Sequence, residues 1–375
     1  MAAATIKRGA SSESDEYLAV AELYAKLQQN DIALTVFFCS PNYHHERLAD
    51  AIKKHFGTAP VIGCTTAGEI TPKGYQEGSI TGFSLGDAEF KVVTNLFDNL
   101  QNFNVPASPE AVKSLQRLLS EKAVISAENT FGFLLVDGSS VREESVINGL
   151  YSGMGDIPIF GGSAGDGLNF GPTYLYYEGA FHTDCAILAL IHTQRPFQVF
   201  KTQHFVQASQ KMVVTEAIPE KRIVLEINAE PAGKEYARIV GLGDIKLTPM
   251  TFAAYPVLLN VAGAPYIRSI QQVNPDASLT FYCAIDEGIV LTVAKGEDIK
   301  ANLLQQLDAL EKSIGEPQLI ISCDCILRRL ELIDKNLLDE VGTILAAHNA
   351  IGFSTYGEQY QAMHINQTLT GVAIA

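Results

Sequence analysis

The sequence of this 375-residue chain contains one pattern of secondary structure three times, and this repetition constrains its fold more than any other feature. In the first copy, apolar segments typical of buried strands lie at residues 33–40, 59–63 and 79–85. Between the first two segments, Leu48, Ile52 and Phe56 recur every four residues on one face of a predicted helix. Because a helix that links two strands usually makes them parallel, we expect a parallel pair followed by a strand that turns back.

The other two copies keep this order with different spacing. Their strands are predicted at residues 130–136, 157–161 and 185–192 in the second copy, and at residues 318–323, 349–352 and 368–375 in the third. The helix of the second copy carries Val146 and Leu150, and a long apolar helix face extends from Leu330 to His348 in the third. The unequal spacing argues against a solenoid and favours internal duplication across two domains.

Residues 193–299 differ from the three copies, because they contain several short segments typical of antiparallel strands. We therefore predict an N-terminal strand and helix extension at residues 1–30, a first domain at residues 31–205 and a second domain at residues 206–375. The expected fold class is α/β with α+β character. It consists of two domains with mixed β-sheets flanked by helices, built from repeated strand–helix–strand–strand units.

Charge and composition limit the kinds of partner. The chain has 27 Lys+Arg against 42 Asp+Glu, a net charge of −15, which argues against a nucleic-acid partner because a phosphate backbone would be repelled. Apolar runs are too short for membrane insertion and the N-terminus lacks a signal-peptide core, so we expect a cytoplasmic protein. The six cysteines lie mostly in apolar strand segments, which favours reduced, packed thiols.

Each copy has a similar loop after its second strand: GCTTAGE, FGGSAGD and GFSTYGE. These loops combine small hydroxyl side chains, glycine and an acid, so they are candidates for binding a small ligand through backbone N–H groups, hydroxyls and carboxylates. The alternative is structural, since a carboxylate can accept hydrogen bonds from its own turn. The candidate ligand-binding residues are Thr65, Thr66, Gly68, Glu69, Gly162, Ser163, Asp166, Ser354, Gly357 and Glu358.

The sequence lacks the signatures of familiar enzymes. It contains no G-x-S-x-G nucleophile motif and no P-loop, and the pair Cys323 and Cys325 has no second Cys or His pair at zinc-ligand spacing. We therefore expect a protein that is not an enzyme.

Two histidines stand in apolar surroundings, where an imidazole is either a satisfied core residue or a ligand. His204 lies in FKTQHFVQ, and His364 lies in MHINQT before the last strand. Residue type alone leaves both alternatives open.

Several of these motifs resemble a known family. IGCTTAGEI at residues 62–70 and IFGGSAGDG at residues 159–167 resemble the N-terminal FIST domain. KMVVTEA, RIVLEINAEPAGKEYARIVG and AIGFSTYGEQYQAMHINQTLTGVAIA resemble the C-terminal FIST domain. The resemblance implies a sensory module that binds a small ligand. Because this sequence shows no output domain, it resembles the stand-alone subgroup of the family. Some members of that subgroup bind haem, sense nitric oxide and regulate a partner histidine kinase.

The resemblance implies specific roles for the candidate residues. Haem b would take its iron ligand from His204 or, second, from His364, and nitric oxide would bind at the opposite position. The output would be a histidine kinase or another signalling protein, and the net charge suggests that its docking surface is basic. The alternative is a haem-free sensor for an amino acid or a similar metabolite, whose ammonium group suits Glu69, Asp166 and Glu358.

Overall fold

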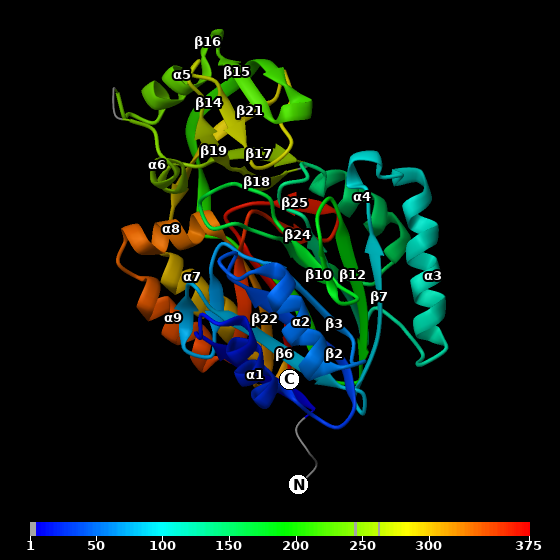
Figure 1. Cartoon of the computed structure of the whole chain (residues 1–375). Coiled ribbons are helices and arrows are strands. Elements are labelled where there is room, and N and C mark those ends of the chain that lie inside the picture. Colours follow the sequence, from blue (N-terminus) through cyan, green and yellow to red (C-terminus); the bar gives the residue numbers. More distant parts are fainter. Residues whose placement is uncertain (1–4, 244–245, 262) are drawn as a thin grey trace.

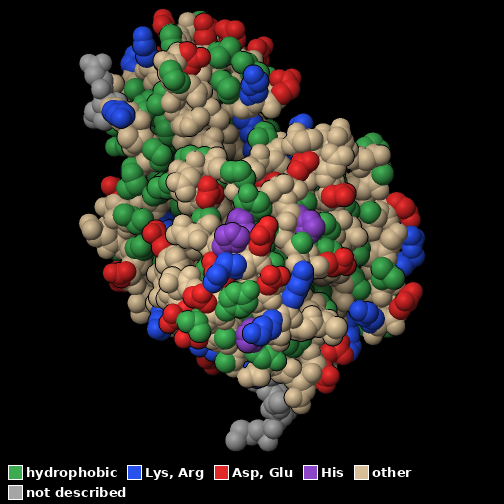
Figure 2. Space-filling model, viewed as in Figure 1, with side chains coloured by type: hydrophobic (Ala, Val, Ile, Leu, Met, Phe, Trp, Pro, Cys, Tyr) green, Lys and Arg blue, Asp and Glu red, His purple; other side chains and the backbone are tan. Residues whose placement is uncertain are grey.

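The computed structural model describes residues 5–243, 246–261 and 263–375 (Figure 1). Residues 1–4 of the expected N-terminal extension lie outside the described residues. The chain forms a large body of three similar units and a smaller lobe that is inserted into the third unit (Figures 1 and 2). In the described part of the chain, no helix is both long and apolar enough to cross a lipid bilayer.

Unit 1 begins with a strand and a helix that precede the first predicted copy. Its elements are β1 (Ile6–Ser11), α1 (Glu16–Leu27), β2 (Ile32–Cys39), α2 (His45–Phe56), β3 (Val61–Thr65), β4 (Glu69–Thr71), β5 (Gly74–Gln76) and β6 (Ile80–Gly86). The parallel pair is β2 and β3, and β6 returns antiparallel to β2. The predicted order of strand, helix, strand and returning strand is therefore confirmed for this unit.

Unit 2 repeats this arrangement. Its elements are β7 (Phe90–Phe97), η1 (Leu100–Asn102), η2 (Val105–Ala107), α3 (Ser108–Ser120), β8 (Thr130–Val136), α4 (Glu143–Met154), β9 (Ile159–Ser163), β10 (Leu175–Tyr177), β11 (Ala180–His182) and β12 (Ala186–Thr193). The strands β8 and β9 are parallel, and β12 runs antiparallel to β8.

Unit 3 has the same plan, interrupted after its first strand. Its elements are β13 (Phe197–Thr202), α7 (Ile299–Ile314), β22 (Leu319–Cys325), α8 (Ile326–Asp334), α9 (Leu338–Ala347), β23 (Ala350–Thr355), β24 (Glu358–Tyr360), β25 (Met363–Ile365) and β26 (Leu369–Ile374). The single long helix face predicted from Leu330 to His348 is wrong, because two helices occupy this stretch. Asn336 adopts a left-handed backbone (φ 55°) between them and ends α8.

The insertion between β13 and α7 is the smaller lobe, drawn in green and yellow in Figure 1. Its elements are β14 (Phe205–Ile218), η3 (Pro219–Lys221), β15 (Ile223–Ile227), β16 (Glu230–Pro231), α5 (Ala232–Ile239), α6 (Pro249–Ala254), β17 (Val257–Val261), β18 (Ala264–Arg268), β19 (Ile270–Val273), β20 (Leu279–Phe281) and β21 (Val290–Gly296). These strands form one antiparallel sheet with its own apolar core. The domain boundary that we propose between residues 205 and 206 falls at the first residue of β14.

The short hairpins tie the three units together, because each hairpin extends the sheet of another unit. The hairpin β4–β5 of unit 1 pairs with β23 of unit 3, β10–β11 of unit 2 pairs with β3 of unit 1, and β24–β25 of unit 3 pairs with β9 of unit 2. The exchange therefore closes a ring of three units. At its centre, one phenylalanine from each unit packs in a shared core: Phe38 is stacked on Phe353 and meets Phe133 edge-on.

Local sequence signals set the ends of several helices. Asp15 accepts hydrogen bonds from Tyr17 N–H (3.0 Å) and Leu18 N–H (3.1 Å) at the start of α1. Gly57 and Gly155 follow α2 and α4 with positive φ angles of 59° and 64°, which glycine adopts without strain. Mixed sheets flanked by helices, in repeated units, confirm the predicted fold class.

Candidate functional site

The three similar loops lie next to one another in the folded chain, because the exchanged hairpins bring the carboxyl ends of the parallel strands together. Backbone hydrogen bonds join every pair of loops: Gly165 N–H donates to the Thr65 carbonyl (3.0 Å), Ala67 N–H to the Ser354 carbonyl (2.9 Å), and Ser163 N–H to the Gly357 carbonyl (2.9 Å). The candidate residues thus share one region of the molecule, at the point where all three units meet.

Glu69 and Glu358 occupy matching places in units 1 and 3, as the first residues of β4 and β24. Glu69 accepts hydrogen bonds from the Thr66 hydroxyl and from both the N–H (3.1 Å) and the hydroxyl (2.8 Å) of Ser79. Glu358 accepts the same set from Thr355 and from Thr368 (N–H 3.2 Å, hydroxyl 2.7 Å). Both carboxylates therefore accept hydrogen bonds within their own loops, which is the structural role considered above as the alternative to ligand binding.

Both glutamates are fully buried, and burial disfavours their charged forms. Burial raises the pKa of Glu69 to about 7 and the pKa of Glu358 to about 8, although their hydrogen bonds act in the opposite direction. Each group therefore exchanges a proton close to neutral pH.

Asp166 does not match the two glutamates. In unit 2 the hairpin begins with Leu175, and Asp166 lies in the longer connection between β9 and β10. Its carboxylate accepts a hydrogen bond from Gly171 N–H (3.2 Å), and its own N–H donates to the Tyr356 hydroxyl (3.0 Å). The expectation that Asp166 occupies the same place in its loop as Glu69 and Glu358 is therefore wrong.

The remaining loop candidates are buried and closely packed. Thr65 Oγ1 accepts a hydrogen bond from Tyr174 N–H (3.1 Å), and Ser163 Oγ accepts one from the Gln359 side-chain amide (3.0 Å). Ser354 Oγ is buried and has no hydrogen-bond partner in the described part of the chain.

The glycines of these loops allow close contacts. A Cβ atom on Gly162 would lie 2.7 Å from Thr355 Cγ2, and one on Gly357 would lie 2.2 Å from the His364 ring. A Cβ atom on Gly68 would lie 2.3 Å from Arg329 Nη1. Glycine is required at these positions because other residues approach the backbone closely, from another unit at Gly68 and Gly162 and from the same unit at Gly357.

His204 has partners for both ring nitrogens. Its Nε2–H donates to the Glu331 carboxylate (2.9 Å), and its Nδ1 accepts from Arg328 Nη1 (3.3 Å). Burial lowers the pKa of His204, while its hydrogen bond to Glu331 acts in the opposite direction. The imidazole connects the start of the insertion to α8, and neither nitrogen is free to ligate haem iron in this arrangement.

His364 is also buried and engaged. Its Nδ1 accepts from the Gln359 amide (3.2 Å), and its Nε2–H donates to the Tyr282 carbonyl of the insertion (3.3 Å). The described arrangement of His204 and His364 therefore does not fit a haem, because each imidazole would have to give up a hydrogen bond and move to reach one.

A cavity of about 290 Å³ opens beside the loop of unit 1. All three units line it: residues 40–42 and 66–69 after β2 and β3, residues 167–169 of unit 2, and one face of α8. Ligands of open α/β sheets commonly bind outside the carboxyl ends of parallel strands, which is where this cavity lies. Thr66, Gly68 and Glu69 are the predicted residues that line it.

Arg329 is the residue of this cavity that the sequence motifs did not reveal. It lies in the first turns of α8, is buried, and donates from Nη1 to the Ala67 carbonyl (2.9 Å). Its Nη2 lies 2.8 Å from a carboxylate oxygen of Glu77, and its Nε has no partner among the described residues. The cavity therefore holds a buried guanidinium and a buried carboxylate.

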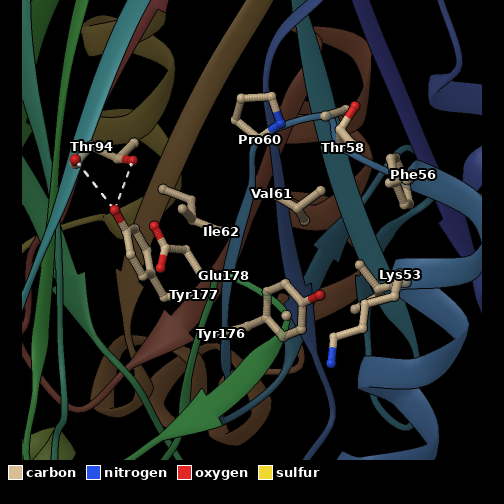
Figure 3. Close-up of a pocket in the computed structure, with 14 residues that line it drawn as sticks. Lys53, Phe56, Thr58, Pro60, Val61, Ile62, Thr94, Tyr176, Tyr177 and Glu178 are labelled. Atoms are coloured by element: carbon tan, nitrogen blue, oxygen red, sulfur yellow. Dashed lines mark hydrogen bonds between the residues drawn. The ribbon is translucent and has the colours of Figure 1, made fainter.

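A second hollow of about 490 Å³ lies on the surface between α2 and the β10–β11 hairpin (Figure 3). It is lined at one side by Lys53 and at the other by Tyr177, whose hydroxyl donates to the Thr94 carbonyl (3.3 Å). Pro60 and Val61 place it at the amino end of β3. The hollow therefore lies at the opposite end of β3 from the loops, and none of the candidate loop residues lines it.

The insertion is attached to the body by a buried ion pair. Arg222 Nη2 donates to Glu143 (2.6 Å) and to Glu144 at the start of α4, and its Nη1 donates to the Tyr282 carbonyl (2.6 Å). Ala284 N–H also donates to Glu144 (2.6 Å). These contacts hold Tyr282 over the loop of unit 3.

Comparisons with known proteins agree with this architecture. A family model described as the FIST N domain matches residues 33–230, and one described as the FIST C domain matches residues 232–361. An uncharacterized protein of Methanocaldococcus jannaschii is 23% identical over 365 residues, which cover 87% of this chain and 70% of that protein. The matches extend across the three units and the insertion.

Proposed function

Because the chain belongs to the FIST family of sensory, ligand-binding domains, we propose that it senses a small zwitterionic ligand, namely an amino acid or a similar metabolite. The observation that carries this proposal is the cavity beside Glu69, in which a buried guanidinium and a buried carboxylate line one space. Arg329 is suited to the ligand carboxylate because a guanidinium binds carboxylates through paired hydrogen bonds. Glu69 is suited to the ammonium group.

The size and position of the cavity support the same class of ligand. Its volume of about 290 Å³ lies at the lower end of the range for ligand pockets, which favours a compact metabolite. Residues of all three units line it, so a ligand would contact each unit at once. A sensor needs such a position, because a ligand changes a protein only through contacts that differ between its states.

Thermal unfolding with the twenty standard L-amino acids tests this proposal. A ligand that binds the folded state stabilises it, by about 2.7 kcal/mol at a concentration of 100 Kd, so the correct amino acid should raise Tm. Arg329→Gln should abolish the rise, whereas Arg117→Gln, on the exposed face of α3, should leave it unchanged. If no amino acid shifts the Tm of the wild type, the amino-acid proposal is wrong.

The haem hypothesis rests on the family resemblance and makes a separate prediction. A haem ligated by His204 would require the imidazole to leave Glu331, and His364 would have to leave Tyr282. Reconstitution with haem should then give a Soret band that nitric oxide shifts and that His204→Ala or His364→Ala removes. An absorption spectrum without a protein-dependent Soret band would exclude haem and nitric oxide as the signal.

We also propose that the output is another protein in the cytoplasm, such as a histidine kinase. The net charge of −15 favours a basic docking surface on that partner, and acidic groups are spread over the visible face together with scattered basic ones (Figure 2). Association should then weaken as salt shortens the Debye length to about 8 Å. Binding that is insensitive to ionic strength would contradict this expectation.

A further inference from the structure

Glu77 stands at the mouth of the cavity, in the turn between β5 and β6. Its carboxylate lies 2.8 Å from Arg329 Nη2 and is the anionic partner of that guanidinium in the structure. The contact joins a turn of unit 1 to a helix of unit 3. Both residues line the cavity beside Glu69.

The two partners differ sharply in exposure. The Arg329 side chain is 6% exposed and is anchored at Nη1 by the Ala67 carbonyl, whereas the Glu77 side chain is 73% exposed. The guanidinium is thus fixed, and the carboxylate reaches it from solvent. An ion pair with such an exposed partner contributes little to stability, because water and salt compete for the carboxylate.

Gly78, next to Glu77, has free space on its outer side. It adopts a positive φ of 68°, and a Cβ atom placed on it would contact no other atom within 4 Å. Gly78 itself is partly exposed, whereas Ser79 after it is buried and held by Glu69. Because the Glu77 side chain is exposed, rotation about its own side-chain bonds can separate its carboxylate from Arg329.

We propose that Glu77 is a specificity-determining residue, which acts as an internal carboxylate that a ligand must displace from Arg329. This inference rests on the proposed function, since it concerns the same cavity. A ligand that carries a carboxylate exchanges one anion for another at the guanidinium and leaves the charge balance of the site unchanged. A neutral amide cannot make this exchange, because it would remove the anionic partner of a buried cation.

The test measures binding of three related probes by isothermal titration calorimetry: propionate, propionamide and L-alanine. Glu77→Gln removes the internal competitor at an exposed position, so the variant should fold normally. We expect it to bind propionate about two- to fivefold more tightly than the wild type, the range that corresponds to a weak exposed ion pair. L-alanine should show a smaller gain, because Glu77 also attracts its ammonium group.

Three controls complete the design. Propionamide should bind neither protein, Arg329→Gln should lose propionate binding, and Glu110→Gln, which removes one partner of an exposed pair on α3, should behave as the wild type. Equal propionate affinities for the wild type and Glu77→Gln would overturn the role of Glu77 and leave the proposed function intact. Failure of both proteins to bind any carboxylate probe would overturn the role of Glu77 and the amino-acid proposal together.

Discussion

The loops that follow the second parallel strand in units 1 and 3 have the same local structure but different surroundings. In each unit a glutamate is held by a threonine three residues before it and by a hydroxyl residue ten positions after it. Beside Glu69 a cavity opens, whereas the loop of unit 3 is covered by Tyr282 of the insertion, which lies in one apolar cluster with Tyr356 and Ile326. A duplicated loop thus lines a cavity or lies in a sealed core according to what packs over it.

The largest expected difference concerns the strands that precede these loops. In the parallel register, Cys39 of β2 pairs with Thr65, and Asp324 of β22 pairs with Ser354, the residue that matches Thr65 in unit 3. Unit 3 therefore has a buried carboxylate where unit 1 has the buried thiol of Cys39. Arg328 compensates it, with Nε donating to Asp324 (2.7 Å) and both side chains fully buried.

Arg328→Met should lower the free energy of unfolding by about 3–5 kcal/mol, because it leaves the buried Asp324 carboxylate without its cationic partner. Urea denaturation followed by circular dichroism measures this loss. Arg117→Met is the matched control, since it breaks an exposed pair with Glu110 and should change stability by less than about 1 kcal/mol. Similar losses in the two variants would show that the buried charge is not a special feature of unit 3.

The pH dependence of stability separates the two glutamates. Their pKa values in the folded chain, about 7 for Glu69 and about 8 for Glu358, lie above the ordinary value of 4.5. The folded state therefore binds more protons than the unfolded state above pH 4.5. Their contribution to stability is full below that pH and is lost as the pH rises to about 7 for Glu69 and about 8 for Glu358.

Between pH 7 and pH 8 most of this loss comes from Glu358, with a slope of at most about 1.4 kcal/mol per pH unit. Glu358→Gln should flatten the unfolding free energy in that interval. Glu69→Gln should flatten it between pH 5 and pH 7 and leave the higher interval close to the wild type. Urea denaturation at pH 5, 6, 7 and 8 checks both curves, and identical curves for the two variants would contradict the assignment.

The sequence predicted the features that depend on local patterns. Apolar periodicity located the repeated strands and the helix of unit 1, and the loop motifs contain Glu69 and Glu358. The hairpin exchange was not predicted, because strands of three residues such as β4 and β24 carry almost no periodicity and pair with distant units. The break between α8 and α9 depends on one left-handed residue, Asn336, within a continuous apolar pattern.

The cavity was not predicted either, because its residues come from segments that are far apart in the sequence. Arg329 contacts Ala67 across 262 positions, and Glu77 joins the same guanidinium from unit 1. Nothing in the local pattern distinguishes Arg329 from Arg328, its neighbour on α8, which turns inward to Asp324. The roles of both arginines follow from the packing of unit 3 against unit 1.

The smallest expected difference concerns the two capping threonines. Thr66 and Thr355 each donate a hydrogen bond to their glutamate and accept one from the glycine N–H two residues later (3.2 Å to Gly68, 3.1 Å to Gly357). Valine keeps the shape and removes both bonds, which costs about 1–2 kcal/mol where the partners stay buried. Thr355→Val should show this full loss, because the insertion covers its loop.

Thr66→Val should cost about 0.5–1 kcal/mol less than Thr355→Val, since Thr66 lines the cavity and water there can replace part of the lost bonding. Chemical denaturation of the two variants measures the difference, with Thr343→Val on α9 as the exposed control. A loss for Thr66→Val equal to that for Thr355→Val would mean that the cavity of unit 1 gives its loop no access to solvent. The difference between the loops of units 1 and 3 would then involve only the charged residues around Arg329.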